Sequence, residues 1–338
     1  ALNAGSSRNW YDVDCSADGT RIASSSFNFD LRGSSDSGAT WSTLPTGTTN
    51  RDVLAVSDDG STIAAFNGSV DNVRVSKDFG ATWTSHSVGV AGQWCGPSCS
   101  ADGTVMVVAD GKPGYIWTSG DSGTTWTRQD TSGSRMWRDV DCSADGSRII
   151  AAAYTNDIYL SEDSGVTWTR SSAPNGEYYW AVASSATGQK LVAACWFGGA
   201  IYTSADGGAT WVARTEAGIR RWRCVACSAD GATIVAGVAY DPGYLFISQD
   251  SGTTWTRCDA GGSRDWTSVA MTADGSRFFA TYSSASGNVL SGTATFTLST
   301  TTVSTGSLSG SQGDAVELQY VGNDRFHILS HQGDLGAK

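Results

Sequence analysis

The sequence of 338 residues lacks the patterns of helical and membrane-spanning proteins. No stretch keeps the i, i+3, i+4, i+7 spacing of an amphipathic helix over three turns, and there is no run of about 18 apolar residues. Proline is scarce, at 5 residues. Short runs rich in Val, Ile, Tyr and Thr instead recur between clusters of Gly, Asp and Ser, which is typical of many short strands. The sequence therefore predicts an all-β protein without a membrane span.

Positive charge is also in short supply. The formal net charge is -11, and lysine occurs only at Lys77, Lys112, Lys190 and Lys338, so 18 of the 22 basic residues (22 minus 4) are arginine. A surface that binds nucleic acid needs a basic field, so no nucleic-acid partner is predicted. Arginine favours bidentate contacts with anionic groups and stacking on aromatic rings.

Residues that would hold a metal or a cofactor are rare. The only histidines are His86, His327 and His331, and two histidines four residues apart make a weak metal site. No zinc ribbon, P-loop or dinucleotide-binding fingerprint is present. The sequence predicts no cofactor and no metal.

The eight cysteines do not form the pattern of a disulfide framework. Four recur at one place of a repeat described below, where they would lie too far apart to pair: Cys15, Cys99, Cys142 and Cys227. The others could pair in ways that sequence does not define: Cys95, Cys195, Cys224 and Cys258. No signal peptide is visible in a chain that starts at Ala1, and we expect a secreted or extracytoplasmic protein.

What the sequence does contain is a repeat. One unit reads W-x-x-V-x-C-S-A-D-G, followed by two apolar runs and a second motif. The S-A-D-G turn begins at Ser16, Ser57, Ser100, Ser143, Ser185, Ser228 and Thr272, in steps of 41 to 44 residues. Seven copies, each with four strand-like runs, predict a seven-bladed β-propeller of four-stranded blades.

The second motif, S-x-D-x-G-x-T-W, is here called the box motif. It occurs six times, at Ser34–Trp41, Ser76–Trp83, Ser119–Trp126, Ser161–Trp168, Ser204–Trp211 and Ser248–Trp255. It resembles the Asp-box, or BNR, repeat of sialidases and related propellers, and the resemblance extends to about residue 300. It implies a structural hairpin between the third and fourth strands of a blade, in which the Asp accepts backbone N–H groups, the Gly allows positive φ and the Trp anchors the turn.

The end of the chain departs from the repeat. The seventh unit lacks the box motif, with Leu298 where Trp is expected. We predict a propeller over residues 1–301, closed end to end without strand exchange from the N-terminus, and a linker with a C-terminal β-hairpin over 302–338. A final outer strand supplied by the tail is the alternative. The C-terminal hairpin pairs Ala315–Tyr320 with Arg325–Ser330. It could pack on the propeller, mediate homo-oligomer assembly or be an appendage.

A ligand site belongs on the face opposite the box motifs, near the central channel. The innermost strands begin there with Trp and Arg, which suit sugar faces and anionic groups. Trp180, in Tyr178-Tyr179-Trp180, counts as the aromatic residue of its blade. The alternative is a structural wedge between blades. The ligand-binding candidates from this ring are Arg8, Trp10, Arg51, Arg135, Trp137, Arg221, Trp222 and Arg264.

Residues that differ between blades are better site candidates than repeated ones. The loops between second and third strands supply Tyr115, Tyr154, Trp196, Phe197 and Tyr240. Trp196 and Phe197 are the most suggestive pair, because two large rings in a Gly-flanked loop are costly to expose.

Catalytic candidates are fewer. A sialidase would need an arginine triad, a Tyr–Glu pair and an acid/base Asp, and the R-I-P motif of that family is absent. Weak candidates for any glycosidase or lyase are Asp30, Asp157, Glu177, Tyr178 and Asp241. Asp12-x-Asp14 and Asp139-x-Asp141 recur in two blades, which favours a structural role.

Regular blades with short loops favour a shallow binding cup. The leading interpretation is a lectin-like propeller that binds glycans, including anionic ones. A carbohydrate-active enzyme with one site at the channel and a protein-assembly scaffold are the alternatives.

Overall fold

The computed structural model describes residues 9–27, 29–46, 52–67, 71–154, 157–240, 243–284 and 287–294, together with four strands near the C-terminus. The chain divides into two compact units, Ala1–Ala294 and Thr295–Lys338. In the described part, no helix is both long and apolar enough to cross a membrane. The boundary predicted at residue 301 stays a prediction.

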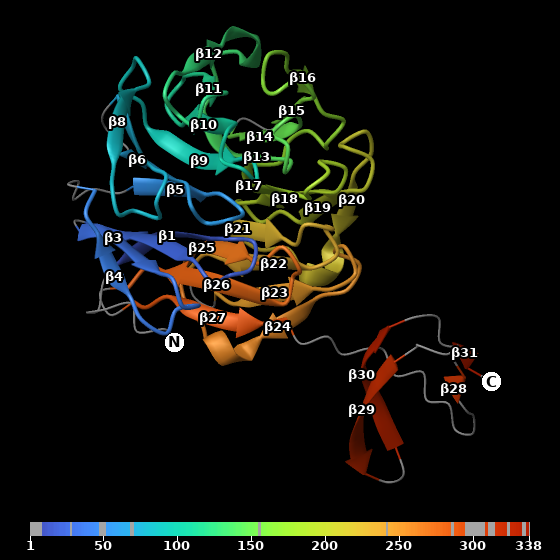
Figure 1. The fold of residues 1–338 in the computed structure, drawn as a ribbon. Coiled ribbons are helices and arrows are strands. Elements are labelled where there is room, and N and C mark those ends of the chain that lie inside the picture. Colours follow the sequence, from blue (N-terminus) through green and yellow to red (C-terminus); the bar gives the residue numbers. More distant parts are fainter. Residues whose placement is uncertain are drawn as a thin grey trace. The chain divides into compact units, whose positions relative to one another are not determined.

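The first unit is a seven-bladed β-propeller, as predicted (Figure 1). Each blade is an antiparallel sheet whose strands follow chain order. The innermost strands are β1 (Trp10–Cys15), β5 (Asp52–Val56), β9 (Trp94–Cys99), β13 (Trp137–Cys142), β17 (Tyr179–Ser184), β21 (Trp222–Cys227) and β25 (Trp266–Met271). The second strands are β2 (Ile22–Ser26), β6 (Ile63–Asn67), β10 (Met106–Asp110), β14 (Ile149–Ala153), β18 (Leu191–Cys195), β22 (Ile234–Val238) and β26 (Arg277–Tyr282).

The outer strands complete the blades. The third strands are β3 (Phe29–Ser34), β7 (Asn72–Ser76), β11 (Ile116–Ser119), β15 (Asp157–Ser161), β19 (Ile201–Ser204), β23 (Leu245–Ser248) and β27 (Leu290–Thr293). The outermost strands are β4 (Ser42–Leu44), β8 (Thr84–Ser87), β12 (Thr127–Gln129), β16 (Thr169–Arg170), β20 (Val212–Arg214) and β24 (Thr256–Cys258). A predicted fourth strand of blade 7 lies outside the described residues. Single 3₁₀ turns follow β12, β20 and β24: η1 (Asp130–Ser132), η2 (Thr215–Ala217) and η3 (Asp259–Gly261).

The hydrophobic core is divided among the interfaces between blades. Each of the seven buried clusters in the described residues joins two neighbouring sheets. One of them packs Trp10 and Ile22 of blade 1 against Phe279 of blade 7, which closes the ring. Burial of apolar surface stabilises a folded protein by about 25 cal/mol per Å², so these interfaces supply the main driving force for folding.

A circle of backbone hydrogen bonds closes the ring a second time. In each S-A-D-G turn, the second residue donates its N–H to the carbonyl of the equivalent residue in the next blade. The seven donors are Ala17, Asp58, Ala101, Ala144, Ala186, Ala229 and Ala273, and the bonds measure 2.8–2.9 Å. The last bond, from Ala273 N to Ala17 O, joins blade 7 to blade 1.

The box motif forms the predicted hairpin between third and fourth strands. In blade 1, Asp36 Oδ1 accepts from Thr40 N at 2.8 Å and from Ser34 Oγ at 2.8 Å. Gly38 has φ of 89°, and Trp41 Nε1 donates to its carbonyl at 3.0 Å. These hydrogen bonds to the ionised carboxylate lower the Asp pKa, for Asp78 to about 2. The box carboxylates therefore stabilise the hairpin turns.

The second unit contains the predicted hairpin, with β29 (Ala315–Gly322) paired antiparallel to β30 (Arg325–Gln332). Two short strands, β28 (Leu308–Ser309) and β31 (Gly336–Ala337), pair with each other. A role of this unit in self-association stays a prediction.

Candidate functional site

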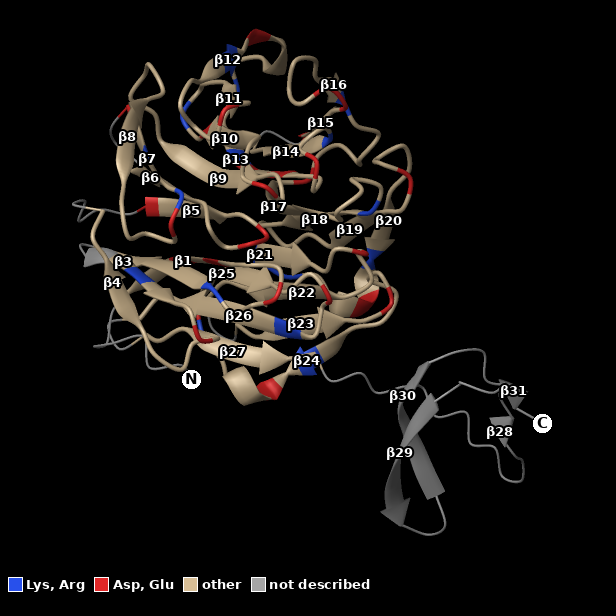
Figure 2. Ribbon diagram, in the orientation of Figure 1, with Lys and Arg blue, Asp and Glu red and all other residues tan. Residues whose placement is uncertain are grey.

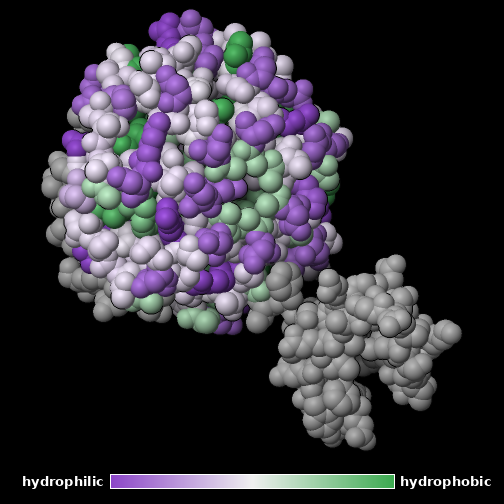
Figure 3. Space-filling model, in the orientation of Figure 1, coloured by the Kyte–Doolittle hydropathy of each residue, from purple (hydrophilic) through white to green (hydrophobic). Residues whose placement is uncertain are grey.

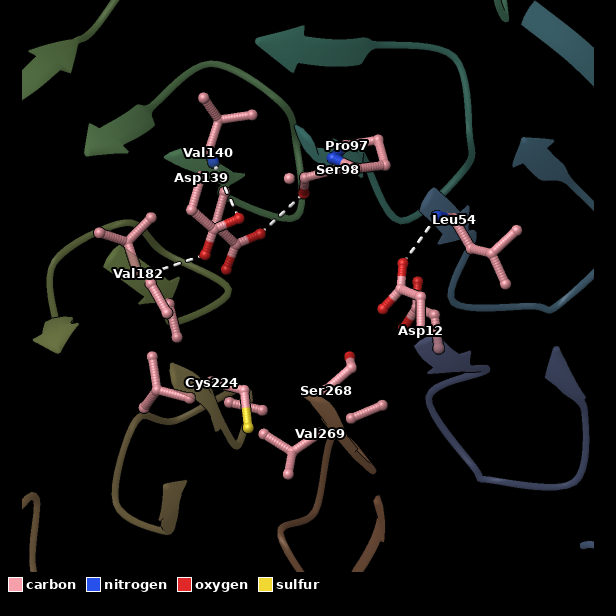
Figure 4. A pocket seen from close by; sticks show the side chains of 18 of the residues that line it. Asp12, Leu54, Pro97, Ser98, Asp139, Val140, Val182, Cys224, Ser268 and Val269 are labelled. Carbon is pink, nitrogen blue, oxygen red and sulfur yellow. Dashed lines mark hydrogen bonds between the residues drawn. The ribbon is translucent and has the colours of Figure 1, made fainter. Parts of the chain in front are cut away.

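The innermost strands surround a channel of about 590 Å³ (Figure 4). The circle of S-A-D-G turns lies at one end, and the starts of the strands form the opposite end, here called the mouth. Both ends are lined by all or nearly all blades, so the channel itself is repetitive. A site for one ligand has to come from residues that break the repeat.

Such residues lie five positions before each S-A-D-G turn, at what we call the mouth position, and in six of the seven blades they directly follow a buried aromatic side chain. In five blades a β-bulge there takes one residue out of the pairing with the second strand. A bulge re-aims the side chain of the extra residue, and bulges are common beside binding sites. The mouth positions hold Tyr11, Asp52, Cys95, Arg138, Trp180, Arg223 and Thr267, and all but Asp52 line the channel.

Blade 5 corrects one assignment made from sequence. Trp180 was counted as the structural aromatic residue of its blade, but Tyr179 occupies that place and has no exposed surface. Its hydroxyl donates to the Pro174 carbonyl at 2.9 Å. Trp180 is displaced by one residue to the mouth position, where it lines the channel.

Trp180 begins a continuous group of rings from blades 4, 5 and 6. We call it the aromatic cluster: Tyr154, Tyr178, Trp180, Trp196, Phe197 and Tyr240. Trp180 and Trp196 stack with centroids 4.3 Å apart and an interplanar angle of 22°. Trp196 contacts Tyr240 edge-on at 5.8 Å, and Phe197 contacts Tyr178 at 5.1 Å. Sequence reasoning brought together four members of this cluster as ligand candidates, and the structure places them side by side.

The aromatic cluster is partly exposed to solvent. The face in Figure 3 is mostly hydrophilic, and the charges in Figure 2 are spread over all blades. Phe197, Tyr240 and Tyr178 are 51%, 50% and 40% exposed. Ile219 adjoins the cluster at Gly198 and is 61% exposed. These are four of the seven large hydrophobic residues exposed in the described chain, so the patch is localised.

Hydrogen bonds fix the loops that carry the cluster. Trp196 N donates to Tyr178 O at 2.8 Å, which ties the blade 5 loop to the start of β17. Tyr240 has φ of 63°, in the left-handed region that costs a non-glycine residue free energy. Its N–H donates to Asp265 Oδ1 at 3.1 Å, and the Arg221 guanidinium lies 5.7 Å from its ring. The rings are therefore held in place without a ligand.

Two arginines occupy mouth positions beside the cluster. The Arg138 guanidinium lies over the rings of Tyr154 and Trp180, at 4.4 and 4.7 Å. Arg223 Nη1 pairs instead with Asp265 Oδ1 at 3.2 Å. Sequence reasoning named neither arginine, although counting back five residues from each S-A-D-G turn finds both.

Several predicted ligand residues lie in the core. Trp10, Trp137 and Trp222 have no exposed surface. Trp10 and Trp137 donate their Nε1–H to the carbonyls of Gly287 and Gly114, each at 3.1 Å. Such side chains wedge between blades and offer no surface to a ligand, which fits the structural alternative.

Two arginines and a tyrosine from the same set serve their own blades. Arg135 lies 4.1 Å from the Tyr159 ring and donates to Ser132 O. Arg264 lies 4.2 Å from the Tyr282 ring and donates to Gly261 O. Tyr115 lies 4.7 Å below Arg128, a stack that Tyr244 and Arg257 repeat in blade 6. Arg8, Arg51 and Asp241 lie outside the described residues, as does the side chain of Asp30.

The catalytic candidates are engaged elsewhere. Glu177 Oε1 accepts from the Tyr202 hydroxyl at 3.0 Å, whereas Tyr178 packs in the aromatic cluster. Asp157 pairs with Arg170 at 2.5 Å.

The four aspartates of the channel join neighbouring blades by hydrogen bonds, and Figure 4 shows two of them, Asp12 and Asp139. Asp12 Oδ2 accepts from Leu54 N at 2.8 Å, and Asp14 Oδ2 accepts from Val56 N at 2.7 Å. Asp139 and Asp141 repeat this with Val182 N and Ser184 N, both at 2.8 Å. Burial raises the pKa of all four, that of Asp14 to about 8. No set of three or more His, Cys, Asp or Glu side chains in the described chain is arranged to hold a metal.

Comparison with known proteins adds the fold but no family. No protein-family model and no curated protein matches the sequence. The GH74 xyloglucanase from Xanthomonas campestris matches with a TM-score of 0.69 at 16% identity, over 86% of this chain and 52% of that chain. The GH74 enzyme of Niastella koreensis matches with a TM-score of 0.68 at 17% identity, over 86% and 53%.

A structure of another kind is equally similar. YCF48 from Cyanidioschyzon merolae matches with a TM-score of 0.65 at 16% identity, over 86% of this chain and 96% of that chain. This chain thus spans about half the length of the GH74 proteins and nearly all of YCF48. At such identities the likeness shows the propeller fold alone.

Proposed function

We propose that this protein is a glycan-binding propeller whose binding surface is the aromatic cluster. The observation that carries the proposal is the exposure of Tyr178, Phe197 and Tyr240 above the stacked pair of Trp180 and Trp196. Aromatic faces bind the C–H faces of sugars, and rings held in place before binding lose little conformational entropy. The six box motifs, read as Asp-boxes, and an extracytoplasmic location belong to the same proposal.

Binding fits the geometry better than hydrolysis does. The candidate carboxylates Glu177 and Asp157 have partners outside the cluster, and each channel aspartate accepts backbone N–H groups. The GH74 neighbours support a glycan-related role, since one of them is a xyloglucanase. This support for a glycan-related role comes from similarity of fold alone.

The test is a panel of neutral, uronic and sulfated glycans, with binding and reducing-end release measured on the same samples. We expect binding without release, and a loss of about tenfold or more in affinity in a Phe197→Ala/Tyr240→Ala variant. Tyr115→Ala is the matched control, because its ring belongs to a stack repeated between blades, and it should bind like the wild type. Release of reducing ends would replace this proposal by a hydrolase.

A protein-assembly scaffold is the second candidate, on the observation that exposed Ile219 extends the aromatic cluster with an aliphatic side chain. One solved structure of the similar protein YCF48 holds a D1 peptide. Absence of binding to every glycan, with retained folding, would favour a protein partner at the same surface.

A further inference from the structure

Arg138 and Arg223 occupy the same position in blades 4 and 6 but have different surroundings. In both blades the arginine follows the buried tryptophan, at the bulge of the innermost strand. Arg223 pairs with Asp265, the residue that precedes the buried tryptophan of the next blade. The residue in that place beyond Arg138 is Tyr178, which carries no charge at neutral pH. The repeat thus places a carboxylate at this position for Arg223 and an uncharged residue at the same position for Arg138.

Nothing else in the described chain neutralises Arg138. No ion pair found among the described residues includes it. Its Nε is buried without a hydrogen-bond partner there. The nearest carboxylate along the chain, that of Asp139, accepts from Val182 N and Val140 N at 2.8 and 3.1 Å. A partly dehydrated cation with unused donors is costly, and an anion that reaches it recovers that cost.

The position of Arg138 matches the reach of a sugar bound on the rings. Its guanidinium lies 4.7 Å from the ring of Trp180, which stacks on Trp196. It also lines the channel at the mouth. A sugar seated on the cluster could therefore direct a substituent into the mouth. The planar guanidinium offers paired N–H donors that suit a carboxylate.

We propose that Arg138 binds an anionic group of the ligand, and that the ligand is an acidic glycan bearing carboxylate groups. The inference rests on the proposed function and names the class of glycan. Arg138 acts by direct contact with the anion, while Arg223 keeps the loop of Tyr240 in place through their shared partner Asp265.

The experiment compares one sugar chain in two charge states. Calorimetry would measure the affinity of a uronic acid oligosaccharide and of its methyl ester, which removes the charge and keeps the rings. We expect the acid to bind about tenfold or more tightly than the ester. Arg138→Gln should bring this ratio close to one with little change in affinity for the ester. Arg223→Gln, the matched control, should keep the ratio.

A second pair of variants tests the inference without changing Arg138, in case the Arg138→Gln variant does not fold. Tyr178→Asp places a carboxylate where blade 7 has Asp265, and Tyr178→Asn has nearly the same shape without the charge. The Asp variant should lower the acid-to-ester ratio below that of the Asn variant. Equal binding of acid and ester by the wild type would overturn the inference and leave the proposed function intact. Absence of binding to both would also overturn the inference, whereas only absence of binding to the whole glycan panel would overturn the proposed function. A sulfated oligosaccharide that binds more tightly than the acid would overturn the assignment to carboxylates.

Discussion

The two ends of the central channel differ in how strictly they follow the repeat. At the S-A-D-G end, seven equivalent residues form seven equivalent hydrogen bonds. At the mouth, the equivalent position holds six different residue types in seven blades, with only arginine occurring twice. The comparison teaches that uniform positions hold the ring together, whereas the divergent positions at the mouth give each blade a different surface.

The largest expected effect is the loss of stability caused by substituting a tryptophan that is buried between two blades. Trp137→Ala should reduce the free energy of unfolding by about 3–5 kcal/mol, because it empties an interface between two blades. Phe197→Ala, at the exposed rim, should change it by no more than about 0.5 kcal/mol. Urea denaturation of both variants would measure the difference, and similar losses would contradict the division between the two ends.

Solution pH should separate the two kinds of aspartate. Folding raises the pKa of Asp14 from 3.8 to about 8, so the folded protein keeps a proton that the unfolded chain loses. Its contribution to stability therefore falls as pH rises from about 4 to about 8. Box residue Asp78, with its pKa lowered to about 2, acts in the opposite direction, and its contribution is lost as pH falls from about 4 to about 2.

The measurement is the urea midpoint across this pH range. Asp14→Asn should flatten the decline between pH 4 and 8, whatever its effect on absolute stability. Asp78→Asn should instead flatten the loss at low pH. An unchanged profile in the Asp14 variant would show that its carboxylate is ionised in the folded protein.

A smaller difference in the free energy of unfolding is expected between variants of Trp137 and Trp222, which occupy equivalent positions between blades. Trp137 Nε1 donates to Gly114 O at 3.1 Å, whereas Trp222 Nε1 is buried with no partner in the described chain. Trp137→Phe should therefore cost about 1 kcal/mol more than Trp222→Phe, since only the first substitution leaves a carbonyl without its donor. Equal unfolding free energies would indicate that Trp222 also has a partner, such as a buried water.

The smallest predicted effect concerns the paired arginine. Asp265→Asn keeps an oxygen that can accept from Tyr240 N but removes the charge opposite Arg223. Affinity for an acidic oligosaccharide should rise a few-fold, because a second cation becomes available at the mouth. An unchanged affinity would restrict anion binding to Arg138.

Much of the fold can be predicted from the sequence because the same structural unit is repeated seven times along the chain. The spacing of the S-A-D-G turns predicts the number of blades, and the box motif predicts which hairpin it forms. Of the site, Trp196, Phe197, Tyr154 and Tyr240 could be found as loop residues that differ between blades, and Tyr178 only as a weak catalytic candidate. Their assembly into one surface depends on which blades are neighbours, and the repeat order supplies that.

The residues that sequence reasoning missed are those shifted by a bulge. The repeat assigns Trp180 as the aromatic residue of its blade, but Tyr179 takes that place and the bulge at Trp180 re-aims its side chain to the mouth. The different surroundings of Arg138 and Arg223 depend on Tyr178 and Asp265, 40 and 42 positions further along the chain. No local pattern shows such a partner.

The circle of S-A-D-G hydrogen bonds also sets the size of the opening at its own end of the channel. A row of blades with free ends could spread to admit a wide ligand. A closed circle of fixed circumference cannot widen on one side unless a bond on its rim breaks. The S-A-D-G end therefore acts as an aperture of constant diameter.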